Sequence, residues 1–178
     1  VIKYFKNDKL RNREKRNLLN LSFPFLPIFY GIIKDKNGEA LAIEYISGQL
    51  LSEINFDEDS LIKKSDILIQ ILLSLKCIHN KGLIYRDLKP DNIKIVNYNN
   101  VILFDFDRSI TTDETESTIV LSDFSAPEKN YSFKSDVYSF GLMINYLLTR
   151  KEIQDNPKFG TMCSKCTNLN PDERPSID

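Results

Sequence analysis

A polar cluster near the middle of the chain contains the residue types that phosphate chemistry needs. Asp87, Lys89 and Asn92 lie in one short stretch, Tyr-Arg-Asp-Leu-Lys-Pro-Asp-Asn, and Asp105 follows further along. Carboxylate and amide oxygens are the ligands that hard cations such as Mg²⁺ prefer, and a lysine offsets the charge of a phosphoryl group. The sequence therefore predicts a site that holds a metal–phosphate complex beside a carboxylate able to orient an attacking hydroxyl.

A hairpin is expected to bring these residues together. Apolar runs at 92–96 and 101–104 flank a polar, turn-like stretch and predict two paired strands. Asp87 and Asn92 stand where the chain enters the hairpin, and Asp105 stands where it leaves. The three oxygen-bearing side chains should therefore converge.

The remaining elements follow from apolar periodicity and from turn residues. We expect strands over 1–6, 29–33 and 40–46, and helices over 8–21, 58–80, 135–149 and, more weakly, 164–169. The polar and acidic segment 110–118 is expected to be a mobile loop. Residues 150–162 are expected to form a reduced connection. Strands thus dominate the first part of the chain and helices the second.

The two polar motifs resemble the catalytic loop and the metal-binding motif of eukaryotic-type protein kinases, H-R-D-L-x-x-x-N followed by D-F-G. The resemblance implies that Asp87 is the catalytic base and that Lys89 steadies the γ-phosphate of ATP. It also implies that Asn92 and Asp105 are the Mg²⁺ ligands and so contact the bound nucleotide. Lys-Pro after Arg-Asp-Leu is similar to serine/threonine kinases rather than tyrosine kinases.

Three further elements extend the resemblance through the second half of the chain. Residues 125–128 (Ser-Ala-Pro-Glu) match the A-P-E element that closes the activation segment of a kinase. Asp136 matches the aspartate that holds the backbone of the catalytic loop. Arg174 matches the arginine that pairs with the A-P-E glutamate, which here is Glu128. The resemblance therefore implies a buried Glu128–Arg174 ion pair.

Upstream residues resemble the nucleotide site of the same family. Val-Ile-Lys at the start of the chain resembles the V-A-I-K strand, so that Lys3 would bind phosphate and Glu14 would be its ion-pair partner. Residues 42–46 resemble the hinge, where the backbone C=O of Glu44 and the backbone N–H of Ile46 would read adenine. The alternatives are an exposed terminal lysine and a surface helix glutamate. An apolar spine is expected to link the two lobes through Leu18, Phe29, Tyr85 and Phe106.

Four positions depart from the family pattern. Tyr85 replaces the His of H-R-D, and Asp107 replaces the Gly of D-F-G, where a positive φ would be costly for a side chain. Lys94 stands where an apolar residue usually lies beneath adenine. Leu121 stands where serine/threonine kinases usually have Thr.

Negative charge on the activation segment is expected to meet Arg86, the residue before the proposed base. That charge would come from a phosphate or from the carboxylates already present. The candidate phosphate acceptors are Thr111, Thr112, Thr115, Ser117, Thr118 and Ser122, and the carboxylates are Asp113, Glu114 and Glu116.

Composition argues against several other classes of protein. The chain has 178 residues with 24 Lys and Arg against 25 Asp and Glu, so we expect no nucleic-acid partner. Apolar runs fall short of the ~20 residues of a membrane span, so we expect no membrane partner. Three cysteines favour a reducing, intracellular and cytoplasmic location. Cys163 and Cys166 form a C-x-x-C pair, but a tetrahedral metal site needs four ligands, so we expect packing instead.

Together these features predict an α+β, two-lobed protein kinase-like fold with an incomplete β-rich N-lobe and a mainly helical C-lobe. Residues 1–46 would form the partial N-lobe, from the lysine-bearing strand to the hinge, and residues 47–178 the C-lobe without its extreme C-terminal end. The glycine-rich loop expected before Lys3 would belong to a longer parent chain.

The resemblance implies ATP- and Mg²⁺-dependent phosphoryl transfer to serine or threonine hydroxyls of protein substrates. The alternative is a pseudokinase, a binding or scaffolding module with weak or no catalysis. A small-molecule kinase of similar fold is disfavoured because the A-P-E and Pro-x-x-Arg-Pro elements belong to the protein-substrate lobe.

Overall fold

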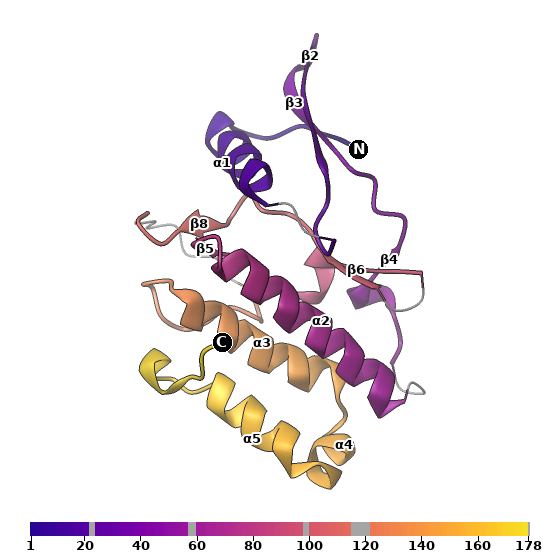
Figure 1. The fold of residues 1–178 in the computed structure, drawn as a ribbon, viewed down its shortest axis with the longest axis vertical. Helices are drawn as coiled ribbons and strands as arrows, with labels where there is room; N and C mark the ends of the chain where they lie inside the picture. Colours follow the sequence, from indigo (N-terminus) through magenta and orange to yellow (C-terminus); the bar gives the residue numbers. More distant parts are fainter. Residues whose placement is uncertain (22–23, 57–59, 98–99, 115–121, 178) are drawn as a thin grey trace.

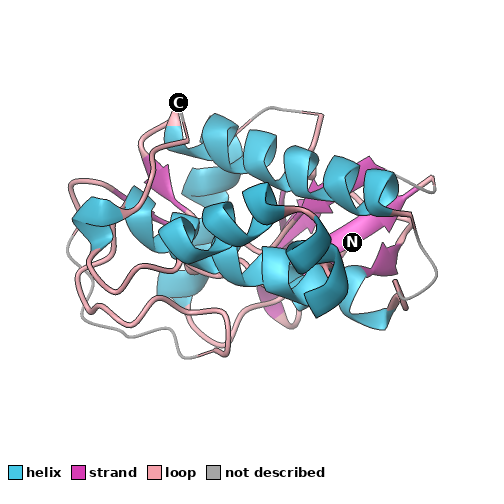
Figure 2. Cartoon of the chain, turned by 90° about the horizontal axis from the view of Figure 1, so that it is seen from below, coloured by secondary structure: helices cyan, strands magenta, loops and turns pink. Residues whose placement is uncertain are grey.

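The chain divides into a small sheet region and a stack of helices (Figure 1). The computed structural model describes residues 1–21, 24–56, 60–97, 100–114 and 122–177. The sheet region carries the N-terminus and one helix, and the other helices run beside one another in the remainder of the molecule (Figure 2). None of the helices in the described ranges is long and apolar enough to cross a membrane.

The sheet region contains three antiparallel strands in the order β1-β3-β2. They are β1 (Ile2–Lys3), β2 (Phe29–Asp35) and β3 (Gly38–Ile43). Gly38 has φ of +112° at the tight turn between β2 and β3, a conformation that favours glycine. Helix α1 (Asp8–Asn20) begins at Asn7, whose side chain accepts a hydrogen bond from the backbone N–H of Leu10. The predicted strands and helix are thus present, although β1 is shorter than expected.

Helix α2 (Leu61–His79) forms the centre of the helical part and precedes the short strand β5 (Leu83–Ile84). Ser60 is its N-cap, and its side chain accepts a hydrogen bond from the backbone N–H of Lys63. The residues that face the core recur at helical spacing, as the sequence predicts: Ile67, Leu68, Ile71, Leu75 and Ile78. The helix ends before Gly82, which has φ of +70°.

The predicted hairpin is confirmed as β6 (Ile93–Val96) and β7 (Asn100–Leu103), which pair antiparallel. A third short strand, β4 (Gln49–Leu50), pairs with the outer side of β6. Gly48, just before β4, lies so close to β6 that an added Cβ would be 2.5 Å from the carbonyl oxygen of Ile95. Two single-turn helices, Leu51–Glu53 and Pro90–Asn92, flank this sheet. The division of the chain at residues 46 and 47 stays a prediction.

The prediction of an unstructured loop from residue 110 is wrong at its start. Ile110–Thr111 form β8, which pairs antiparallel with β5. Ile110 is only 2% exposed, so its side chain belongs to the buried interior. Apolar periodicity did not predict this strand, because Ile110 is a single apolar residue at the start of a polar stretch. Residues 115–118 lie outside the described ranges.

The C-terminal helices differ from the prediction in their bounds. Helix α3 (Phe133–Leu147) begins at Ser132, whose side chain caps it. The region expected to be reduced contains α4 (Arg150–Asp155) and α5 (Pro157–Cys166), and a short turn follows at Pro171–Glu173. The predicted helix over 164–169 is therefore wrong in its bounds, because Pro157 starts α5 earlier and the helix ends at Cys166.

The cysteine pair packs in the core between α3 and α5, as the sequence predicts. Cys163 and Cys166 are buried, and Cys163 Sγ lies 3.5 Å from the carbonyl oxygen of Gly141. Burial raises the pKa of the Cys166 thiol to about 11. An added Cβ on Gly141 would lie 2.7 Å from Cys166 Cβ, so glycine permits the close approach of the two helices.

Candidate active site

The loop over residues 85–92 is anchored by Asp136, near the start of α3. The backbone N–H groups of Tyr85 and Arg86 donate to the two carboxylate oxygens of Asp136, each at 2.8 Å. Asp136 is fully buried, and His79 Nε2 lies 2.8 Å from its Oδ2. Arg86 has φ of 71°, a backbone conformation that is strained for a residue other than glycine and that the surrounding contacts must hold in place. Asp136 therefore fixes the backbone from which this loop presents its polar side chains.

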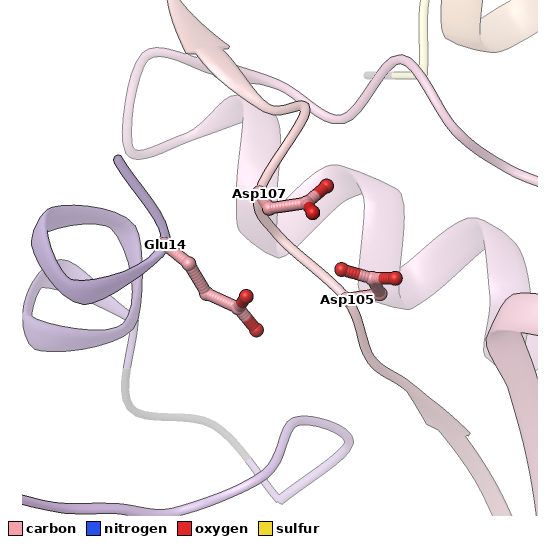
Figure 3. Close-up of side chains that lie close together, drawn as sticks. All are labelled: Glu14, Asp105 and Asp107. Carbon is pink, nitrogen blue, oxygen red and sulfur yellow. The ribbon is translucent and has the colours of Figure 1, made fainter. Parts of the chain in front are cut away.

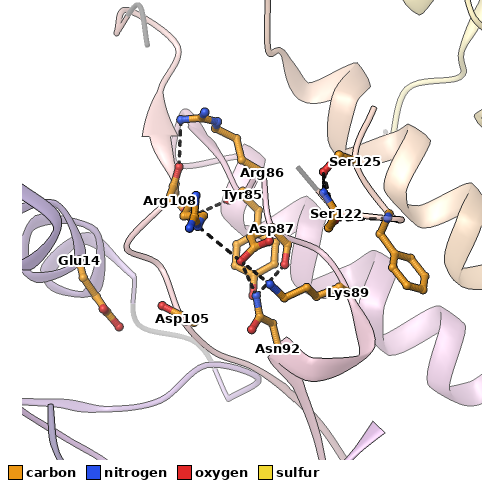
Figure 4. A network of polar contacts seen from close by, with 12 residues as sticks. Glu14, Tyr85, Arg86, Asp87, Lys89, Asn92, Asp105, Arg108, Ser122 and Ser125 are labelled. Carbon is orange, nitrogen blue, oxygen red and sulfur yellow. Dashed lines mark hydrogen bonds and ion pairs between the residues drawn. The ribbon is translucent and has the colours of Figure 1, made fainter. Parts of the chain in front are cut away.

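Asp87 lies in this loop, and among the described residues hydrogen bonds reach one of its two carboxylate oxygens. Its Oδ2 accepts from Asn92 Nδ2 at 2.8 Å and from Lys89 Nζ at 3.1 Å, and Arg108 Nε lies 3.9 Å away (Figure 4). Asn92 Nδ2 also donates to the backbone carbonyl of Asp87 at 2.8 Å. The Oδ1 atom is buried, and no described residue donates a hydrogen bond to it. The structure thus brings together three of the residues singled out from the sequence.

Lys3 joins α1 to the segment that follows β7. Its Nζ lies 2.5 Å from Glu14 Oε2 and 2.8 Å from Asp105 Oδ1. Glu14 is buried, and in Figure 4 Asp105 lies between Glu14 and Asn92. Asp105 has φ of 67°, a backbone conformation that is costly for a residue other than glycine. Lys3, Glu14 and Asp105 therefore form one charged cluster, and the alternative of a surface glutamate is wrong for Glu14.

Three carboxylates lie close together here, those of Glu14, Asp105 and Asp107 (Figure 3). One oxygen of each lies within 4.8 Å of the others. Burial raises the pKa of Glu14 to about 7 against the lowering effect of Lys3, and the other two carboxylates raise it further. The pKa of Asp107 is also raised, first by burial and then by Asp105. The cluster therefore carries more negative charge than its one ammonium group offsets.

The pKa values of both Lys3 and Glu14 are raised, which favours the charged form of the lysine and the protonated form of the glutamate. Burial acts to lower the pKa of Lys3, but the charges of Asp105 and Glu14 outweigh it and raise the pKa. The side chain of Glu14 is more deeply buried than that of Lys3, and Glu14 shares the ammonium group of Lys3 with Asp105. Lys3 is therefore the charged group that holds the cluster together, because two carboxylate oxygens lie within 2.8 Å of its Nζ.

Asn92 and Asp105 fit the Mg²⁺ ligands that the sequence suggests. Asn92 uses its Nδ2 on Asp87, which leaves its carboxamide oxygen as the ligand atom. Asp105 uses Oδ1 on Lys3 and retains Oδ2. Oxygen donors with excess negative charge are what Mg²⁺ prefers. Asp107 adds a further carboxylate to the site. The positive φ that the sequence led us to expect at Asp107 is not found: in the described ranges the non-glycine residues with positive φ are Arg86, Asn97 and Asp105.

Tyr85, which stands where the family has histidine, contacts the segment that follows β7 through its hydroxyl group. The hydroxyl donates to the backbone carbonyl of Phe104 at 2.5 Å, and the ring lies 5.2 Å from the ring of Phe106. Tyr85, Phe106 and Leu18 are buried, whereas Phe29 is partly buried and packs against the same core. The four residues expected to form an apolar spine therefore belong to one core cluster.

A cavity of about 260 Å³ lies between the hinge residues and the charged cluster. Its lining includes Lys3, Glu44, Ile46, Lys94 and Asp105. Lys94 Nζ donates to the backbone carbonyl of Ile46 at 3.0 Å and lies 5.7 Å from the ring centroid of Tyr45. The side chain that departs from the family pattern is thus bonded to the hinge backbone inside the cavity, a contact that the sequence does not predict.

Replacing Lys94 with leucine is expected to tighten ATP binding about tenfold, a change of ~1.4 kcal/mol. A planar base stacks best on an apolar floor, and the leucine would remove an ammonium group that must otherwise be desolvated or moved. Isothermal titration of both proteins with ATP would measure the effect. Lys36→Leu, in an exposed turn, is the matched control. Equal or weaker ATP binding by the Lys94 variant would contradict this interpretation.

The expected pair between Glu128 and Arg174 is present, with Arg174 buried and Glu128 partly buried. Arg174 Nη1 and Nη2 donate to Glu128 Oε1 and Oε2 at 2.7 and 2.9 Å. Ser135 Oγ donates to the same carboxylate at 2.7 Å. Arg174 also donates to the backbone carbonyls of Asn168 and Lys134, each at 2.8 Å. Arg174 therefore ties the A-P-E element to the start of α3 and to the C-terminal turn.

One carboxylate of the activation segment, that of Glu114, pairs with an arginine of α1. Glu114 pairs with Arg16 on α1, and the hydrogen bonds that Arg16 donates lower the pKa of the Glu114 carboxyl group. Arg86 donates to the carbonyl of Arg108 at 3.2 Å, its guanidinium lies 4.2 Å from the ring of Tyr131, and its expected contact with negative charge on the activation segment stays a prediction. Among the other positions named from the sequence, Thr115, Glu116, Ser117, Thr118 and Leu121 lie outside the described ranges.

Comparison with known proteins assigns the chain to a family. Residues 1–170 match the protein kinase domain, and the chain therefore belongs to the protein kinase domain family. It is 34% identical over 140 residues to serine/threonine-protein kinase D of Synechocystis sp., which covers 71% of this chain and 27% of that protein. It is 30% identical over 151 residues to cAMP-dependent protein kinase type 3 of Saccharomyces cerevisiae, covering 77% of the chain and 36% of that protein.

A more distant relative covers more of the chain. Serine/threonine-protein kinase Nek9 of Mus musculus is 27% identical over 176 residues, which is 88% of this chain and 18% of that protein. The chain therefore spans about a fifth to a third of the length of these relatives. The fold is that of a protein kinase domain with an incomplete sheet region and a mainly helical part.

Some residues of the site are not signalled by the sequence. Arg108 lies 3.9 Å from Asp87, and Asn17 donates to backbone carbonyls after Asp105, although neither belongs to a motif. Arg108 directly follows the Asp-Phe-Asp motif and could have been considered on that ground. Asn17 stands three residues after Glu14, on the same face of α1, and only that spacing could have pointed to it.

Proposed function

We propose that this protein transfers the γ-phosphoryl group of ATP to serine or threonine hydroxyls of protein substrates. The observation that carries the proposal is the buried Oδ1 of Asp87, which has no donor in the described part of the chain. A buried acceptor without a partner costs about 1–3 kcal/mol, so it is retained where a ligand supplies the missing hydrogen bond. A substrate hydroxyl is a donor of the right kind.

Each charged residue then has a task in the transfer. Asp87 Oδ1 accepts the hydrogen bond of the substrate hydroxyl and orients its oxygen towards the γ-phosphorus. The new O–P bond forms as the bond from phosphorus to the leaving ADP oxygen breaks, and the hydroxyl proton passes to Asp87. Lys89, 3.1 Å from Asp87 Oδ2, offsets negative charge on the transferred group.

The nucleotide would occupy the cavity between the hinge residues and the charged cluster of Lys3, Glu14 and Asp105. We propose that Lys3, fixed by Glu14, contacts its phosphates, and that the C=O of Glu44 and the N–H of Ile46 contact the adenine. Mg²⁺ held by Asn92 and Asp105 would shield the charge of the phosphate groups. The cavity between these residues, about 260 Å³, supports this arrangement.

A binding or scaffolding domain with weak catalysis is the second candidate. The bond from Lys94 to the hinge carbonyl favours it, because that ammonium group lies where a base would stack. Protein substrates are proposed for the first candidate and protein ligands for the second. Nucleotide binding is therefore the property that separates them.

A thermal-shift titration of the full-length protein with ATP, with and without Mg²⁺, tests the proposal. At 100 times Kd we expect a stabilisation of about 2.7 kcal/mol that depends on the metal. Asp105→Asn should lose the metal dependence, whereas Asp123→Asn, at an exposed position, should keep it. No stabilisation by ATP and Mg²⁺ in the unmodified protein would favour the scaffold.

A further inference from the structure

Asn17 is a fully buried carboxamide on the face of α1 that also carries Glu14. Burying an amide is unfavourable unless its hydrogen-bonding groups are satisfied, which makes its partners informative. Asn17 Nδ2 donates to the backbone carbonyl of Phe106 at 3.0 Å and to that of Ser109 at 2.9 Å. One side chain of α1 thus holds both ends of the turn that follows Asp105.

The carboxamide oxygen of Asn17 is used as well. It lies 3.4 Å from Arg16 Nε and 3.3 Å from Arg16 Nη2, and the same guanidinium pairs with Glu114. A continuous polar chain therefore runs from the turn at 106–109, through Asn17 and Arg16, to Glu114 beyond β8. Helix α1 and this segment are connected at two places by charged or amide groups.

The turn that Asn17 holds is also bonded to the loop of the proposed base. Ser109 Oγ donates to the backbone carbonyl of Tyr85 at 3.0 Å, and the backbone N–H of Ser109 donates to Phe106 O at 3.2 Å. Asp105, with φ of 67°, stands at the entrance to this turn and contacts Lys3. A movement of α1 that separated Glu14 from Lys3 would also pull the Asn17 amide away from its two backbone partners.

We propose that Asn17 is a positioning residue that couples α1 to the turn at 106–109 and so holds Glu14 on Lys3, beside Asp105. It acts through Glu14 and does not touch the reacting groups. The Arg16–Glu114 pair supports the same arrangement with a charge that the chain already carries, so the site is assembled without a phosphate on the activation segment. This inference rests on the proposed function.

A double-mutant cycle in the unphosphorylated full-length protein tests the coupling. Asn17→Leu has a similar volume and removes both donors, and we expect kcat to fall about 10–100-fold with the KM for ATP changed less than about threefold. In a Glu14→Gln background the same substitution should cost less than about twofold, because the residue through which it acts is already absent. Asn12→Leu, exposed on the same helix, is the matched control.

A merely structural role gives a different pattern. Asn17→Leu would then lower kcat by the same factor in both backgrounds, and that result would overturn the proposal, as would no loss in either. The concentration of folded protein is fixed by an ATP-binding titration, so that an unfolded fraction is not counted as lost kcat. An absolute requirement for phosphorylation before any activity would overturn the part assigned to Glu114.

Hydrogen exchange separates this inference from the proposed function. If the unmodified protein transfers no phosphate, the proposed function fails, but amide exchange can still be measured. Asn17→Leu should then speed exchange in α1 and in residues 105–111 at least about tenfold while the rates in α3 stay unchanged. Unchanged rates in α1 and residues 105–111 would overturn the coupling.

Discussion

Replacing Asp87 with asparagine is expected to slow phosphate transfer about 10²–10⁴-fold. The asparagine keeps the size of the side chain and one acceptor oxygen, but it cannot take the proton of the attacking hydroxyl. Because the hydrogen bonds from Asn92 and Lys89 go to one oxygen of Asp87, the fold should change little. Label transfer from [γ-³²P]ATP to a general protein substrate measures the loss.

The matched control for that substitution is Asp91→Asn, which makes the same chemical change in the same segment at an exposed position. Its kcat should stay within about twofold of the unmodified protein, as surface substitutions usually have small effects. Equal rates for the unmodified protein and Asp87→Asn would show that the base has been wrongly assigned.

Replacing Arg174 with methionine is expected to destabilise the protein by about 3–5 kcal/mol. The methionine would leave the partly buried carboxylate of Glu128 without its bidentate partner and would free two backbone carbonyls. For a chain of this length the melting temperature should fall by roughly 10 °C. Calorimetry or circular dichroism would measure it, with Arg150→Met, exposed at the start of α4, as the control.

The same pair predicts a dependence of stability on pH. Burial acts to raise the pKa of Glu128, but the hydrogen bonds from Arg174 and Ser135 outweigh it and hold the pKa below its ordinary value of 4.5. A lowered carboxyl pKa stabilises the fold above pH 4.5, and this contribution is lost as the pH falls through the folded-state pKa. The difference in free energy of unfolding between the unmodified protein and Arg174→Met should therefore shrink below pH 4.5. A constant difference down to pH 3 would contradict the pairing.

The sequence predicts much of the arrangement because contiguous motifs carry it. Asp87, Lys89 and Asn92 share one loop, and the hairpin between Asn92 and Asp105 has a clear alternation of apolar runs. Helix α2 is predictable because its buried residues recur at helical spacing. Local spacing is sufficient for such features.

Contacts that depend on tertiary packing are not predictable in this way. The bond from Lys94 to Ile46 and the two bonds of Asn17 join residues 48 or more positions apart in the chain. Strand β8 is missed because its pairing with β5 depends on one buried residue, Ile110. Helix α5 is misplaced because its start depends on Pro157 rather than on an apolar pattern. Periodicity carries no information about such long-range partners.

The most direct test of the proposed function is the identity of the amino acid that receives phosphate. Full-length protein would be incubated with labelled ATP and Mg²⁺ and with peptide mixtures in which serine, threonine or tyrosine is the sole hydroxyl acceptor. We expect Mg²⁺-dependent label on serine or threonine peptides, lost in Asp87→Asn. Label on tyrosine alone, or equal background label from the unmodified protein and Asp87→Asn, would contradict a serine/threonine kinase.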